Sequence, residues 1–150
     1  MRPRLVVVDA SVAVKWVIPE DYSEEALALL RDHLEGRVEA HSPALILLEA
    51  ASALRRYVVR GVLSPGQALE ALQLIAESEP VLEEVDKTLS EEALRMSLDL
   101  GVTVYDAAYL ALASRLRATF YTADEKLLSN PKVREPGIAR HIAEYQRPAA

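Results

Sequence analysis

Apolar runs that suit buried strands alternate along the chain with segments whose apolar positions recur every three or four residues. The first run, Leu5 to Val8, is mostly β-branched and ends at Asp9, which predicts a strand buried on both faces. Further strands are predicted over residues 37–41, 80–85 and 118–121, with an edge strand over 138–142. These runs are the expected strands of one sheet.

Helical spacing fills the intervals between these strands. It predicts longer helices over residues 23–34, 42–60, 65–78, 88–100 and 105–116, and short ones over 10–14 and 124–128. Four expected helix starts carry capping or proline signals: Asp21 with Glu24, Ser42 before Pro43, Ser64 before Pro65, and Thr88 to Glu91. Residues 130–137 are expected to form a loop.

Strands that alternate with helices favour an α/β fold, with helices on both faces of a central, mainly parallel sheet. The expected architecture is therefore a three-layer α/β/α sandwich, formed as one domain by residues 1–150. In such sheets ligands bind outside the carboxyl ends of the strands. Asp9 follows one of these ends and Asp124 lies just past another.

The amino-acid composition excludes several kinds of active site and of protein. The chain has no cysteine, which excludes disulfide frameworks, thiol nucleophiles and cysteine-built zinc sites. No apolar run is long enough for a signal peptide or a membrane span, so a cytoplasmic protein is expected. The net charge of −6 argues against a protein that coats nucleic acid by neutralising phosphates, but not against an enzyme that gathers carboxylates around a cation.

Four acidic residues are candidates for that chemistry: Asp9, Glu49, Asp106 and Asp124. Each aspartate stands near a helix start, where it could simply accept backbone N–H bonds as a cap. Glu49 is different because it lies inside a helix. The residues before it, 44–48, are apolar all round, which predicts a helix start buried on several sides. A carboxylate emerging there needs partners.

Several carboxylates in one place repel one another, and a divalent cation relieves that repulsion. Mg²⁺ or Mn²⁺ prefers carboxylate oxygen and water, and no histidine stands near these acids in the sequence, which argues against zinc. His33, His41 and His141 are scattered and are expected to be surface or structural residues. The sequence therefore predicts a magnesium or manganese site shared by the four acids.

Four segments of the chain resemble the signature segments of PIN-domain nucleases, in the family's order: residues 7–11, 48–56, 104–113 and 121–127. Length and spacing resemble the VapC toxins of toxin–antitoxin pairs. The resemblance implies a compact α/β/α domain, Mg²⁺ or Mn²⁺ held by Asp9, Glu49, Asp106 and Asp124, and cleavage of RNA. It also implies supporting roles for Ser11 and Thr122. Ser52 departs from the pattern, because many relatives carry asparagine there, and it could alter substrate or metal preference.

An RNA substrate approaching acidic residues needs positive charge along its route. Arg56 and Arg60 share the helix face of Glu49, and Lys15 follows Asp9 closely, so these three are candidate phosphate contacts. They could equally be ordinary solubilising charges. The resemblance further implies a homodimer, assembled through the helices between Ala44 and Ser78, and a cognate antitoxin whose tail covers the cleft.

Other functions remain open at this point. One is a non-catalytic PIN-like module that binds protein or RNA, and another is a housekeeping RNA-processing nuclease without an antitoxin. A haloacid-type phosphatase would carry a second aspartate at the position of Ser11, and a receiver domain would carry a lysine directly after a late strand. Both fit this sequence poorly.

Overall fold

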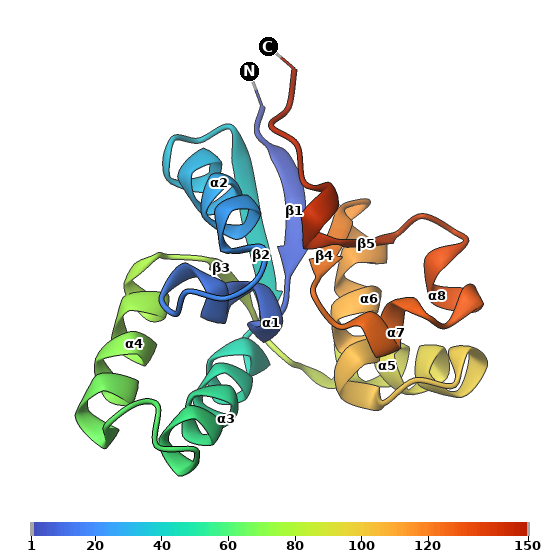
Figure 1. Ribbon diagram of the computed structural model, residues 1–150. Helices are drawn as coiled ribbons and strands as arrows, with labels where there is room; N and C mark the ends of the chain where they lie inside the picture. Colours follow the sequence, from blue (N-terminus) through green and yellow to red (C-terminus); the bar gives the residue numbers. More distant parts are fainter. Residues whose placement is uncertain (1, 150) are drawn as a thin grey trace.

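Five parallel strands form the centre of the computed structural model, which describes residues 2–149 (Figure 1). The strand order is β3-β2-β1-β4-β5, so β1 lies in the middle. The bounds are β1 Arg4–Val8, β2 Val38–Pro43, β3 Val81–Glu83, β4 Thr119–Thr122 and β5 Ala139–His141. Every pairing between neighbours is parallel. The expected sheet is confirmed, and β5 is the expected edge strand.

Helices cover both faces of this sheet. Val6, Val7 and Val8 alternate between the two faces, and none has exposed surface, which requires cover on each side. α2, Ser23–Leu34, packs against β2, while α6, Val104–Leu116, packs against β1, β2 and β4 and is itself covered by α5, Lys87–Leu100. α3, Leu45–Val59, and α4, Pro65–Glu77, form a helical hairpin beside the carboxyl end of β1 (Figure 1). The three-layer prediction is confirmed.

Helix α6 lies in the core, and residues 107–113 along it are all buried. Its 13 residues fall short of the about 20 that a membrane-spanning helix needs. Throughout residues 2–149, no helix combines the length and the apolar character required to cross a membrane.

Short helices complete the connections at the carboxyl end of the sheet. They are α1 Ala10–Ala13, the 3-10 turn Val14–Trp16, α7 Glu125–Leu128, α8 Pro131–Arg134 and the 3-10 turn Ile142–Glu144. The prediction of a loop over residues 130–137 was wrong, because α8 forms within it. Asn130 accepts a hydrogen bond from the amide of Lys132, and Pro131 occupies the first helical position.

Three of the four predicted helix starts were misplaced. Ser42 and Pro43 end β2, because the Ser42 hydroxyl donates to the carbonyl of Val8 at 2.5 Å and so joins two strands. α5 is capped by Asp86, two residues before the predicted Thr88. Asp21 does not cap α2, whose N-cap residue is Tyr22 in the left-handed region at φ 67°. The Ser64 capping box with Gln67 is present as predicted.

The buried face of α3 also differs from the prediction. Ile46, Ala50 and Leu54 face the core, whereas Leu48 is 72% exposed. The expectation that residues 44–48 are buried on several sides was therefore wrong. Glu49, the next residue, is half-buried rather than enclosed.

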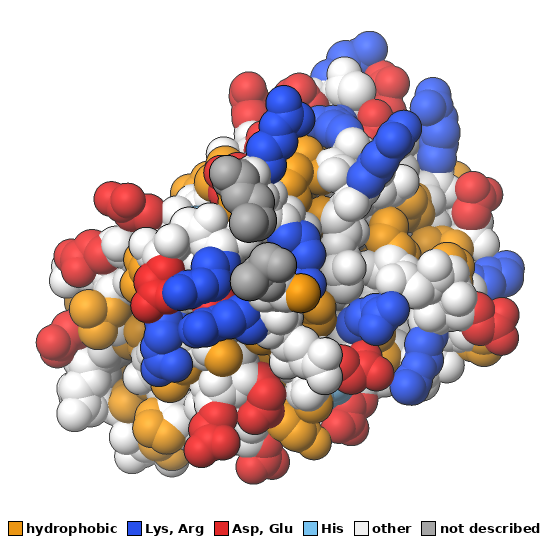
Figure 2. Space-filling model, turned by 90° about the horizontal axis from the view of Figure 1, so that it is seen from above, with side chains coloured by type: hydrophobic (Ala, Val, Ile, Leu, Met, Phe, Trp, Pro, Cys, Tyr) orange, Lys and Arg blue, Asp and Glu red, His pale blue; other side chains and the backbone are white. Residues whose placement is uncertain are grey.

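Three arginines lie at the amino edge of the sheet, opposite the carboxyl ends of the strands. Arg4 begins β1, Arg37 precedes β2 and Arg117 precedes β4. Figure 2 views the molecule from the end where the two termini lie and shows Lys and Arg side chains across this face, with Asp and Glu side chains among them. Buried Asp32 anchors the C-terminal segment to α2 by accepting hydrogen bonds from Tyr145 Oη at 2.7 Å and Arg147 Nε at 2.8 Å. Arg37 also lies 3.8 Å from Asp32, so this buried acid is surrounded by positive charge.

Candidate active site

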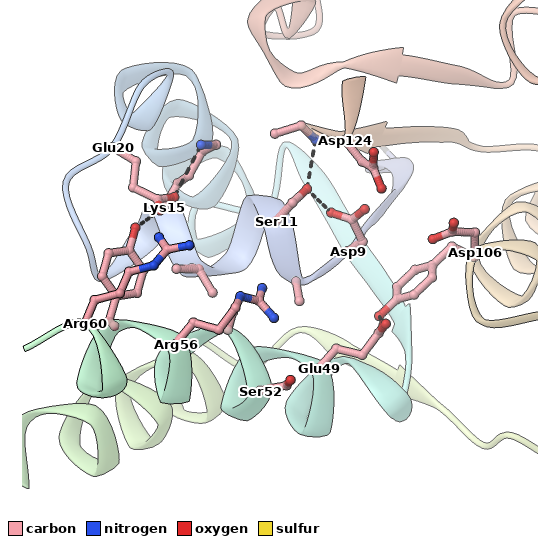
Figure 3. A pocket seen from close by; sticks show the side chains of 16 residues that line it. Asp9, Ser11, Lys15, Glu20, Glu49, Ser52, Arg56, Arg60, Asp106 and Asp124 are labelled. Atoms are coloured by element: carbon pink, nitrogen blue, oxygen red, sulfur yellow. Dashed lines mark hydrogen bonds and ion pairs between the residues drawn. The ribbon is translucent and has the colours of Figure 1, made fainter. Parts of the chain in front are cut away.

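The four predicted acids line one cavity of about 510 Å³ at the carboxyl edge of the sheet. Asp9 follows β1, Glu49 comes from α3, Asp106 from the first turn of α6, and Asp124 from the turn after β4. In Figure 3 these side chains point from separate elements into the same space. Residues up to 115 positions apart in the chain are brought together because parallel strands end at one edge.

Two hydroxyls hold the Asp9 carboxylate. Ser11 Oγ donates to Asp9 Oδ1 at 2.5 Å, and Thr122 Oγ1 donates to Asp9 Oδ2 at 2.5 Å. Each hydroxyl is oriented in turn by a backbone amide: Ala123 N donates to Ser11 at 2.8 Å, and Asp124 N donates to Thr122 at 3.1 Å. Asp9 therefore has one fixed orientation, set jointly by β1 and β4.

The capping interpretation applies to two of the three aspartates. Asp9 accepts from Val12 N at 3.3 Å, and Asp124 accepts from Leu127 N at 3.0 Å, so both cap short helices while facing the cavity. Asp106 is not a cap. That position belongs to Thr103, whose hydroxyl accepts from Asp106 N at 3.0 Å and leaves the Asp106 carboxylate directed at the cavity.

Glu49 has a partner that the sequence did not reveal. Tyr109 Oη, on α6, donates to Glu49 Oε1, on α3, at 2.6 Å. Tyr109 is 1% exposed and stacks on Phe120 of β4 with ring centroids 5.5 Å apart, so its position is fixed by the core. The only sequence signal for this contact is its position one helical turn after Asp106.

Burial makes the ionised form of these acids costly. It raises the pKa of Asp9 from 3.8 to about 6, against the opposing effect of the hydrogen bonds from Ser11, Thr122 and Val12. Burial also raises the pKa of Glu49, with a further contribution from Asp106. The pKa of Asp106 is raised by burial and by the nearby Asp124. The cavity thus brings together acids whose ionised forms are penalised by burial and by one another.

This donor set suits a hard divalent cation. The four acids offer carboxylate oxygens and Ser11 a hydroxyl oxygen, and among residues 2–149 no histidine lines the cavity. Within residues 2–149, no three acidic or histidine side chains are already close enough to hold one ion. Mg²⁺ normally binds through one or two carboxylates and keeps several waters, which matches acids spread around a cavity of this size.

Positive charge lines the other end of the cavity. Lys15, Arg56 and Arg60 all contribute to its wall, and Figure 3 shows both arginines extending from α3 on the side of Lys15. Ser52 lies on α3 between Glu49 and Arg56 and is exposed to the cavity. Glu20 and Tyr57 also line this end, and neither was singled out from the sequence.

Comparison with known proteins assigns the family. A family model described as the PIN domain matches residues 6–133, which include all four acids. The chain therefore belongs to the PIN domain family. It is similar to ribonuclease VapC3 of Pyrobaculum aerophilum, to which it is 32% identical over 123 residues, covering 81% of this chain and 91% of the relative.

Solved structures show the same fold. A crystal structure of a protein from Pyrobaculum aerophilum superposes with a TM-score of 0.67 at 24% identity, covering 93% of this chain and 90% of the other. A toxin–antitoxin complex from Klebsiella pneumoniae contains a chain that superposes with a TM-score of 0.65 at 13% identity, covering 93% and 99%.

Proposed function

We propose that this protein is a divalent-metal-dependent endoribonuclease, acting in the cytoplasm as the toxin of a VapBC-type pair. The observation that carries the proposal is the convergence of Asp9, Glu49, Asp106 and Asp124 on one cavity that also has a cationic end. Relatives named as VapC ribonucleases support RNA as the substrate.

Mg²⁺ or Mn²⁺ would be held by Asp9, Glu49 and Asp106, with Asp124 completing a second position or orienting the attacking water. Bound there, the ion would lower the pKa of water and offset charge that develops on the phosphodiester. Ser11 and Thr122 keep the two Asp9 oxygens in place, each through a 2.5 Å hydrogen bond. Tyr109 does the same for Glu49.

The cationic end would receive the RNA backbone. Arg56, on α3, and Arg60, the residue that directly follows α3, lie four residues apart and line the same cavity as the acids. A strand laid along the cavity would place one phosphate at the acids and the neighbouring phosphates against these side chains. Ser52 lies between the two ends, where its hydroxyl can hydrogen-bond to substrate or to water.

A cleavage assay tests the proposal. Labelled single-stranded RNA is incubated with the protein in Mg²⁺, in Mn²⁺ and in EDTA, and compared with Asp106→Asn. Cleavage that requires the metal and is lost in the variant is expected. Asp99→Asn, which removes an exposed acid from α5, is the matched control and should stay active. An active Asp106→Asn variant, or cleavage in EDTA, would overturn the assignment; no cleavage under any condition would favour a non-catalytic binding module.

An antitoxin partner follows from the same charge distribution. A cavity with several carboxylates at one end is complementary to a basic segment, which would block access of RNA. The toxin–antitoxin complex among the structural neighbours supports this assembly. A small protein encoded directly upstream, with a basic tail, should inhibit cleavage when added in equimolar amount.

We further propose that two copies of the chain form a dimer through the apolar surface of α3 and α4. Leu48 and Val59 on α3, Val62 in the connecting turn and Leu69 on α4 are each more than 60% exposed. Such a concentration of exposed apolar side chains is typical of an interface. Light scattering should show a dimer that Leu48→Glu dissociates, whereas Leu98→Glu, on α5, should leave it intact.

A further inference from the structure

Glu20 occupies an unusual place at the cationic end of the active-site cavity. It is the acidic residue among Lys15, Arg56 and Arg60 in the cavity wall, and it stands in the segment between the first 3-10 turn and α2. Its two carboxylate oxygens are both engaged. Lys15 Nζ lies 3.3 Å from Oε1, and the Tyr57 hydroxyl donates to Oε2.

The groups around Glu20 form a built anion site. Lys15 is only 8% exposed, although its ammonium reaches the cavity. Tyr57 comes from α3, so the two donors approach the carboxylate from different elements. Arg56 and Arg60 influence the Tyr57 hydroxyl electrostatically and lie close to the same position. Burial, followed by Glu20, raises the pKa of Tyr57 to about 12, which keeps its hydroxyl a donor at neutral pH.

The anion in this site is a long side chain from a partly exposed segment. The Glu20 side chain is 25% exposed and can rotate toward solvent, whereas the Lys15 side chain is 9% exposed and packed within the fold. Two hydrogen-bond donors then lose their anionic partner, beside the guanidinium groups of Arg56 and Arg60 that line the same cavity. These are the groups that recognise a phosphodiester oxygen in nucleic-acid complexes.

We propose that Lys15 and Tyr57 form a binding position for an RNA backbone phosphate, which the Glu20 carboxylate occupies until RNA displaces it. This inference rests on the proposed ribonuclease function. Glu20 thereby lowers the affinity for RNA and acts as an internal competitor of the substrate, not as a catalytic residue.

The test is RNA binding in EDTA, where cleavage does not interfere. Fluorescence anisotropy with a 12-nucleotide single-stranded RNA is measured for the wild type and Glu20→Gln at several salt concentrations. The amide keeps the shape of the side chain but removes the competing charge. We expect roughly two- to fivefold tighter binding, the range that a partly exposed ion pair allows. Combining Glu20→Gln with Lys15→Gln should cancel the gain in affinity. It should also reduce the slope of log affinity against log salt concentration by about 0.7, the value of one single-strand phosphate contact.

Controls separate charge from shape. Glu70→Gln removes an exposed acid from α4 and should leave binding unchanged. Glu20→Asp keeps the charge and should not tighten binding. Glu20→Gln that binds RNA no better than the wild type, with an unchanged melting temperature, would overturn the proposal.

Lys15→Gln alone provides a second test of the proposal if Glu20→Gln does not fold. It should weaken RNA binding, while Lys87→Gln, at a 90% exposed side chain on α5, should not. Wild-type affinity of Lys15→Gln would also overturn the proposal. Because binding is read without metal, absence of metal-dependent cleavage would contradict the proposed function without affecting this test.

Discussion

The hydroxyl of Tyr109 donates a 2.6 Å hydrogen bond to Glu49, and this contact joins α6 to α3 across the active-site cavity. It fixes an acid that lies inside a helix, whereas Asp9 and Asp124 each follow a strand end. The ring of Tyr109 is held by Phe120 of the central sheet, so the orientation of Glu49 depends on the packing of the core.

Tyr109→Phe should therefore impair catalysis more than folding. The ring still packs, but Glu49 loses its donor, which also helps keep the pKa of that carboxyl from rising further. Residues that orient metal ligands typically contribute about 10- to 100-fold in metal affinity or activity. We expect a loss of that size in Mg²⁺-dependent cleavage and a change of about 1–2 kcal/mol in the free energy of unfolding.

Urea denaturation and a cleavage time course measure the two effects. Tyr105→Phe is the matched control, because Tyr105 lies on the same helix and is 62% exposed. Equal activity of Tyr109→Phe and the wild type at every Mg²⁺ concentration would show that Glu49 needs no positioning.

Without divalent metal, stability should fall as the pH rises from about 4 to 6. The pKa of Asp9 is raised from 3.8 in the unfolded chain to about 6 in the folded protein, so the folded state binds more protons in this window. At 1.36 kcal/mol per pKa unit the loss attributable to Asp9 is about 3 kcal/mol. The raised pKa values of Glu49 and Asp106 act in the same direction.

Denaturation in EDTA at several pH values, compared between the wild type and Asp9→Asn, isolates this contribution. The difference in stability between the two should move in favour of the variant as the pH rises, and Mg²⁺ should reverse the trend for the wild type only. A constant difference from pH 4 to 7 would mean that Asp9 ionises without penalty.

Reversing the charge of Arg56 should weaken RNA binding and reduce its dependence on salt. Arg56 lines the cavity, whereas its neighbour Arg55 does not, and both are exposed on α3. Arg56→Glu is expected to lower the log–log salt slope by at least about 0.7, the value of one lost single-strand phosphate contact. Arg55→Glu carries the same change in net charge and should have little effect. Identical slopes for the two variants would assign both arginines to solubility alone.

The sequence was most informative where local pattern determines structure. A continuous apolar strand that ends in Asp9 and helices with clear spacing place the acids at one edge of a parallel sheet, because strand direction dictates where the carboxyl ends lie. The Ser64 capping box is equally local and was correctly predicted. The position of α8 was available too, since Asn130 and Pro131 form an ordinary helix start.

Contacts between distant segments were not predictable in this way. Ser42 resembles a helix cap in the sequence, but its hydroxyl donates to the carbonyl of Val8 at the end of β1. This hydrogen bond can form only when β1 and β2 lie side by side in the sheet. The apolar residues 44–48 predict a deeply buried helix start before Glu49, whereas Leu48 beside it is exposed. Glu49 is partnered instead by Tyr109, 60 residues later in the chain, and Glu20 by Tyr57, 37 residues later.

We propose that the four acids together hold the divalent metal on which RNA cleavage depends. The most direct test of this claim is a parallel titration of Mn²⁺ binding by calorimetry and of RNA cleavage, in the wild type and in Asp9→Asn. We predict that wild-type binding and cleavage reach half-maximum at the same Mn²⁺ concentration and that both are lost in the folded variant. Undiminished cleavage by Asp9→Asn, or cleavage that does not follow Mn²⁺ binding, would contradict the claim.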